Sequence, residues 1–286
     1  MGVKILIILA CVPLYVLNAF CDKYASSKYG NKSSNLYNSI KFLIGSILLL
    51  PLVFVDKAPK FGLGTVVCGI VCGIMYAINK TITMKGYEKT SIAFMTLCNA
   101  SGMIIPCVIG HYFWSEKLTV LSALGIILAV IAIVLLKENK ASKKKFAFVG
   151  IVIGVVVFVS SGGKMILQKI IGLYCAGQSI SAYNLYSFVV SFLLVGCFAK
   201  PDRQSKTDMK SILPCAALSA VSLTAISFVM TKLAGSVPSV ILFPLFNGLG
   251  ILCVCIGSIF VFKEKLTVPK AIGLGLGVLG LCLVSL

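Results

Sequence analysis

Three lysines lie inside long apolar runs of the sequence, where an isolated charge is costly. Lys80 lies near the middle of one run, in CGIMYAINKTIT, Lys164 lies in SSGGKMILQK, and Lys41 lies one turn into another run. A buried amine attracts a carboxylate or a phosphate, so each lysine is a candidate for binding an anionic solute. Tyr76 precedes Lys80 by four residues and shares its helical face, and Asn79 adds an amide. We predict that Lys80 lines a polar cavity.

Amides and phenols also interrupt the apolar runs. Asn99 and Asn247 lie within two of them and are further solute-binding candidates, with hydrogen bonding between helices as the alternative. Four more candidates lie near the starts of runs, where anchoring at the membrane interface is the alternative: Tyr37, Asn38, Tyr183 and Asn184. Lys41 and Lys164 have a similar alternative, because a long amine can extend to the interface.

Acidic side chains are scarce. The chain has eight, and we place none of them in the middle of an apolar run; Asp22 comes nearest, at the end of the first run. We therefore expect a binding site that is neutral to positive. Such a site favours an amino acid or another solute with a carboxylate or phosphate. Export of drugs or cationic compounds is the alternative function.

The amino-acid composition indicates that most of the chain lies in lipid. Hydrophobic residues make up 59% of the chain and charged residues 12%, against about 45–50% and about 25% in soluble proteins. Apolar runs of about 20 residues span a bilayer as helices. We predict an all-α polytopic membrane protein, without a cofactor or metal, whose ten transmembrane helices cover 4–21, 35–55, 62–84, 90–113, 118–136, 147–168, 180–198, 211–231, 237–262 and 266–286.

The sequence also repeats itself. EKLTV occurs at Glu116–Val120 and again at Glu264–Val268. Shifts of 148 or 146 residues superpose further polar positions, namely Asn99 on Asn247, Tyr37 on Tyr183 and Asn38 on Asn184. We predict two five-helix repeats, at 1–138 and 139–286. Because five is odd, the repeats are inverted relative to each other, a plan that recurs in transporters with alternating access.

The segments YFWSEKLTVLSALGIILA and IFVFKEKLTVPKAIGLGLG introduce the last, glycine-bearing helix of each half. With ten helices in two sets of five, the chain resembles the drug/metabolite transporter superfamily, and more narrowly its EamA-type ten-helix members. The resemblance implies a secondary transporter of a small organic metabolite in a cell membrane, plasma or inner. Its partners would be the solute and the lipid bilayer but no nucleic acid, with a homodimer left open.

Two further questions have competing answers. A membrane-embedded transferase is a different class of function, but such chemistry needs clustered histidines and carboxylates, and the chain has one histidine. For orientation, lysine and arginine gather in the loops of one face, which places both termini outside by the positive-inside rule. The family resemblance implies both termini inside.

Overall fold

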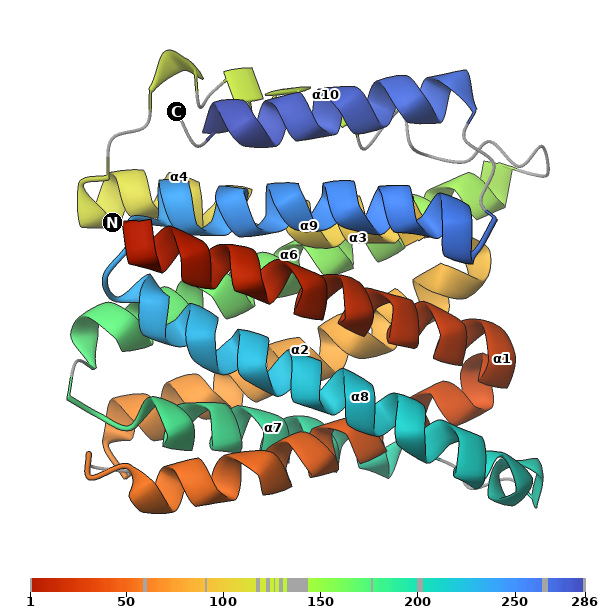
Figure 1. Cartoon of the computed structure of the whole chain (residues 1–286), viewed down its shortest axis with the longest axis horizontal. Coiled ribbons are helices and arrows are strands. Elements are labelled where there is room, and N and C mark those ends of the chain that lie inside the picture. Colours follow the sequence, from red (N-terminus) through yellow and green to blue (C-terminus); the bar gives the residue numbers. More distant parts are fainter. Residues whose placement is uncertain are drawn as a thin grey trace.

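The structure is a computed structural model that describes residues 2–58, 61–90, 92–116, 119–121, 124–125, 127–128, 131–132, 144–175, 177–199, 203–263 and 267–284. Every regular element within these ranges is a helix. The helices are α1 (Gly2–Val55), α2 (Leu63–Lys89), α3 (Ile92–Ser101), α4 (Ile104–Trp114), α6 (Lys144–Tyr174), α7 (Ile180–Cys197), α8 (Arg203–Ala234), α9 (Ser239–Val261) and α10 (Val268–Val284). Figure 1 shows their axes lying roughly parallel, with the chain running in both senses along them.

Helix α1 contains two spans and reverses between them. Asp22 and Lys41 are 19 residues apart, which a straight helix would separate by about 28 Å. Their side chains are in fact in contact, with 2.6 Å between Asp22 Oδ1 and Lys41 Nζ. The chain therefore folds back between two apolar stretches, Gly2–Lys28 and Ser34–Val55, which form the red and orange arms of α1 in Figure 1.

The described residues contain eight helical stretches long and apolar enough to cross a membrane. They coincide with the predicted first to fourth and sixth to ninth spans. The fifth predicted span, 118–136, lies mostly outside the described residues, and the tenth corresponds to the shorter helix α10. The all-helical prediction is confirmed, while the count of ten spans stays a prediction.

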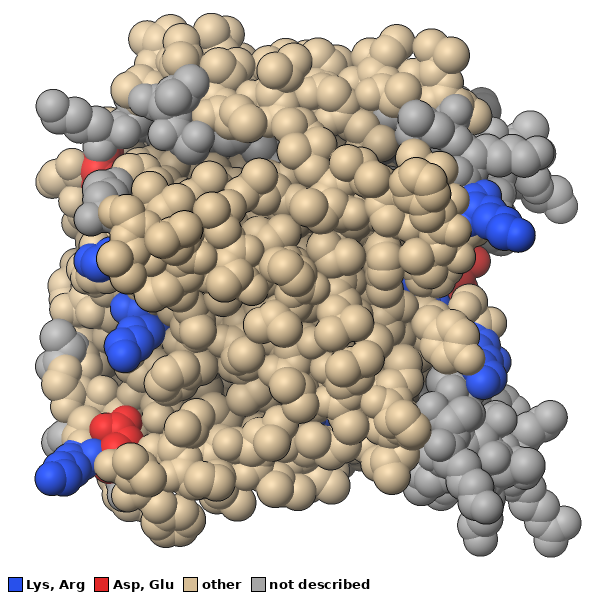
Figure 2. Space-filling view, in the orientation of Figure 1, with Lys and Arg blue, Asp and Glu red and all other residues tan. Residues whose placement is uncertain are grey.

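The outer surface is suited to lipid. Large apolar side chains are exposed along several helices, among them Leu6, Ile47, Val155 and Phe260. In Figure 2 the charged side chains gather toward the two ends of the helices, and the broad middle of the face is uncharged. A soluble monomer rarely exposes apolar patches of this extent.

The fourth predicted span is broken between α3 and α4. Pro106 has no backbone N–H to donate to the carbonyl of Gly102, so the α-helical hydrogen bond at that point is missing. The Gly102 carbonyl instead accepts from the backbone of Ile105, at 3.1 Å. The break places Gly102 against α6, where a Cβ atom on it would lie only 2.7 Å from Gly162 N.

The first copy of the EKLTV motif joins the two halves of the chain. Glu116 Oε1 lies 3.0 Å from Lys169 Nζ in α6. Both carboxylate oxygens of Glu116 also accept from the backbone N–H of Ser239, the first residue of α9, at 3.0 Å. A carboxylate at this position stabilises the N-terminus of the helix. The second copy begins at Glu264, which lies outside the described residues.

Candidate solute-binding site

A buried ion cluster joins α1, α2 and α8. Asp22 accepts from Lys41 at 2.6 Å and, through its other oxygen, from Lys80 at 2.8 Å. The hydroxyl groups of Tyr37 and Ser219 also donate to Asp22, at 3.0 Å and 3.2 Å. Asp22 is 1% exposed and Lys41 0%, so this ion pair lies out of contact with solvent.

The expectation that the acids avoid the middle of the apolar runs therefore needs a correction for Asp22, which was placed at the end of the first run. The first span was predicted to end at residue 21, but the apolar helix continues to Lys28 and places Asp22 inside the bundle. A buried carboxylate is tolerated there because two ammonium groups and two hydroxyls satisfy it. Lys41 does not extend to the interface, because it is buried against Asp22.

Lys164 is held differently from the other two lysines. Its amine donates to Asn79 Oδ1 at 3.0 Å and lies 4.7 Å from the centroid of the Tyr76 ring. Among the described residues, no carboxylate lies within 4 Å of it. The amide nitrogen of Asn79 in turn donates to Asn99 Oδ1 at 3.2 Å and to Ser160 Oγ at 3.1 Å. Lys164 is thus positioned by an amide and a ring, and its charge is not neutralised by an acid.

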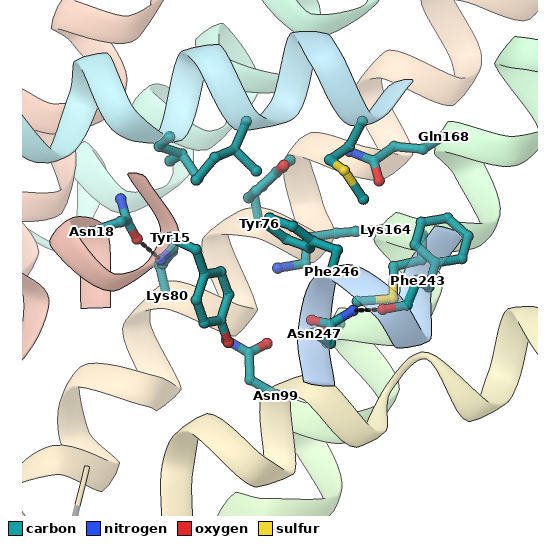
Figure 3. Close-up of a pocket in the computed structure, with 15 residues that line it drawn as sticks. Tyr15, Asn18, Tyr76, Lys80, Asn99, Lys164, Gln168, Phe243, Phe246 and Asn247 are labelled. Atoms are coloured by element: carbon teal, nitrogen blue, oxygen red, sulfur yellow. Dashed lines mark hydrogen bonds between the residues drawn. The ribbon is translucent and has the colours of Figure 1, made fainter. Parts of the chain in front are cut away.

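A pocket of about 90 Å³ opens beside these groups (Figure 3). Its wall includes five of the residues predicted from the sequence, which are Tyr76, Lys80, Asn99, Lys164 and Asn247. Further polar and aromatic side chains complete it, chiefly Tyr15, Asn18, Ser161, Gln168, Phe243 and Phe246. In Figure 3 the Lys80 amine donates to Asn18, at 2.9 Å. The wall therefore brings two ammonium groups, several amides and aromatic rings around one small space.

The other six predicted candidates lie behind the wall: Tyr37, Asn38, Lys41, Asn79, Tyr183 and Asn184. All six are buried, which does not fit the alternative of interfacial anchors for the tyrosine–asparagine pairs. Asn184 Oδ1 accepts from Ser227 Oγ at 2.5 Å, and Ser227 accepts from the hydroxyl of Tyr76 at 3.1 Å. Asn184 thus supports the wall through Ser227, whereas a role in solute binding stays a prediction for every candidate.

The sequence reasoning missed Tyr15 and Asn18, although a signal for them was present. The shift of 146 residues that superposes the Tyr-Asn pairs also places Ser161 on Tyr15 and Lys164 on Asn18. All four residues line the pocket. Corresponding positions of α1 and α6 therefore face the same space, so extending the repeat comparison to the first helix of each half would have identified both residues.

An apolar bundle of membrane-spanning length with charged and amide groups around an internal pocket defines a multi-pass membrane protein with a polar interior pocket. Residues 3–137 match the model of the EamA-like transporter family. The match confirms the resemblance to the drug/metabolite transporter superfamily, and members of this family are transporters.

The chain was also compared with solved structures and with curated proteins. The chain is similar to a protein of known crystal structure, with 12% sequence identity and a TM-score of 0.68 over 99% of this chain and 96% of the other. At that identity the similarity shows the fold alone. No match was found among curated proteins.

Proposed function

We propose that the protein is a secondary transporter of small organic anions in the plasma or inner membrane. The observation that supports this most directly is Lys164, a cation in the pocket wall with no acid beside it among the described residues. Lys80 is a second cation in the same wall. An ammonium in a bundle interior marks a solute path by default, and here it attracts a carboxylate or phosphate.

Export of organic cations, the alternative within the superfamily, is less well supported. A cation carrier needs an acid that can face its cargo, and Asp22 is the buried candidate. Each of its oxygens is already held by a lysine, and Asp22 is absent from the pocket wall. A cation entering this pocket would meet Lys80 and Lys164 first, which favours a transporter of anions.

Alternating access between two inverted repeats, 1–138 and 139–286, is the mechanism that we propose. The contacts between helices support this arrangement, because each contact below recurs when every helix is replaced by its counterpart in the other half. α2 packs on α6, as α8 packs on α1, and α4 packs on α6, as α9 packs on α1. In Figure 1 the first arm of α1 and helix α6 run in opposite directions. Rocking of one half against the other would expose the pocket to each side in turn.

A binding screen followed by reconstitution tests the proposal. The purified protein is melted with lactate, alanine, succinate, inorganic phosphate and tetraphenylphosphonium, and we expect stabilisation by at least one anion. Uptake of that anion into proteoliposomes should fall about tenfold or more in Lys164→Met. The matched control is Lys85→Met, which changes an exposed lysine of α2. Stabilisation by tetraphenylphosphonium alone, or unchanged uptake in Lys164→Met, would overturn the proposal.

A further inference from the structure

The charges around the pocket do not balance. Three ammonium groups, those of Lys41, Lys80 and Lys164, belong to the pocket wall or to the cluster directly behind it. Asp22 is the one carboxylate that contacts them among the described residues. Glu116, which is partly buried, is paired with Lys169 and is outside this cluster. With its lysines protonated and Asp22 ionised, the site has a net charge of plus two.

Spare hydrogen-bond donors lie where the excess charge is. An ammonium has three N–H donors. Among the described residues, Lys80 uses two of them, on Asn18 at 2.9 Å and on Asp22 at 2.8 Å, so one remains for a solute. By the same count over the described part of the chain, Lys164 uses one, on Asn79, and two remain. Lys41 is 0% exposed and absent from the wall. The two uncompensated charges are therefore presented to the pocket by Lys80 and Lys164.

We propose that the cargo is a small dianion, with its charges on two carboxylates or on one phosphate. The inference rests on the proposed function and names its substrate class. Uncompensated charge is unfavourable in a low-dielectric interior. A dianion brings the loaded site to zero net charge, whereas a monoanion leaves one positive charge and a neutral solute leaves two. Charge balance therefore selects the dianion.

The size of the pocket limits the cargo further. A cavity needs at least about 10–15 Å³ of this volume to admit one water molecule. The pocket of about 90 Å³ is several times that minimum, so it admits a small solute. A four-carbon dicarboxylate and inorganic phosphate both meet this limit, and Asn99 and Asn247 in the wall supply amides for their remaining oxygens.

Isosteric ligands separate charge from shape. Succinate, succinamate and succinamide have the same chain and carry two, one and no negative charges when their carboxyl groups are ionised. Their dissociation constants, and that of inorganic phosphate, are measured by calorimetry on the purified full-length protein at constant ionic strength. We expect succinate or phosphate to bind about tenfold or more tightly than succinamate, with succinamide weakest. The better of the two dianions shows whether the charges belong on two carboxylates or on one phosphate.

Two variants change the charge of the site by one unit through different residues. Lys164→Gln removes a cation, and Asn79→Asp adds an anion at the atom that Lys164 contacts. In both, the site has a net charge of plus one, so we expect the preference to move from succinate or phosphate to succinamate. Lys85→Gln, at an exposed position, should keep the dianion preference. Asn79→Asp retains every lysine and serves as the second test if Lys164→Gln does not fold.

The outcomes are distinct for the two proposals. Equal binding of succinamate and the dianions, or a preference unchanged in both variants, overturns the charge-balance inference and leaves an anion transporter standing. Absence of binding by any of the anions overturns the inference and the proposed function together.

Discussion

Asp22→Asn tests whether the buried ion cluster holds the bundle together. The substitution keeps the size of the side chain but removes the charge that Lys41 and Lys80 share at 2.6 Å and 2.8 Å. Removing one partner of a buried ion pair costs about 3–5 kcal/mol, because the other charge stays buried and uncompensated. Here that charge is chiefly Lys41, which is 0% exposed. Lys80 faces the pocket and keeps its bond to Asn18.

We therefore expect Asp22→Asn to lower the free energy of unfolding by about 3–5 kcal/mol, a large part of a typical total of about 5–15 kcal/mol. Unfolding of the purified protein by a denaturing detergent, followed by circular dichroism, measures this change. The double variant Asp22→Asn/Lys41→Met removes the uncompensated lysine as well, and should recover at least half of the loss. Glu88→Gln, at an exposed position near the end of α2, is the matched control and should stay within about 1 kcal/mol of the parent.

Two results would refute this reasoning. If Asp22→Asn is as stable as Glu88→Gln, the cluster contributes no more than an exposed acid does. If removal of the Lys41 charge recovers nothing, the loss comes from the hydrogen bonds of Asp22 and not from a charge left without a partner.

Three further substitutions probe other contacts in the same unfolding assay. Lys164→Met should leave stability unchanged or raise it, since it removes a cation with no acid beside it among the described residues; a loss above about 1 kcal/mol would contradict this. Gly162→Val places a Cβ 2.6 Å from the carbonyl at the break between α3 and α4 and should cost about 1–3 kcal/mol, whereas Gly150→Val meets open space. Glu116→Gln should cost about 3 kcal/mol, and adding Lys169→Met should reduce that cost; strictly additive losses would exclude coupling between the two residues.

The spans themselves could be predicted from the sequence, because their cause is local. A run of about 20 apolar residues must satisfy its own backbone inside lipid and can do so as a helix. Eight predicted spans accordingly reappear as apolar helices. The break in the fourth span depends on Pro106, which is visible in the sequence, but also on the close approach of Gly102 to Gly162, which is not. Local causes thus predicted the helices, while contacts between helices determined how one of them is interrupted.

Asp22 could not be placed correctly from the sequence because its environment is made by distant residues. Taken alone, a carboxylate at position 22 is best assigned to the polar break after a span. Its burial becomes favourable only when Lys41, from the second arm of α1, and Lys80, from α2, reach it. These partners lie 19 and 58 residues away. The residues adjacent in the sequence are enough to identify the buried lysines. They are not enough to identify Asp22, the acid that two of these lysines contact.

The proposed duplication accounts for the scaffold, but the charges of the site arise where the two copies differ. Under the shifts of 146 and 148 residues, each charged group of the ion cluster and of the pocket wall coincides with an uncharged residue: Asp22 with Gln168, Lys41 with Ser187, Lys164 with Asn18 and Lys80 with Phe228. Residues that are identical in the two halves mark equivalent helices, because equivalent helices need the same packing. A symmetric site would carry each charge twice. This one carries each charge once, so under the proposed duplication the net charge of the pocket depends on positions at which the two halves differ.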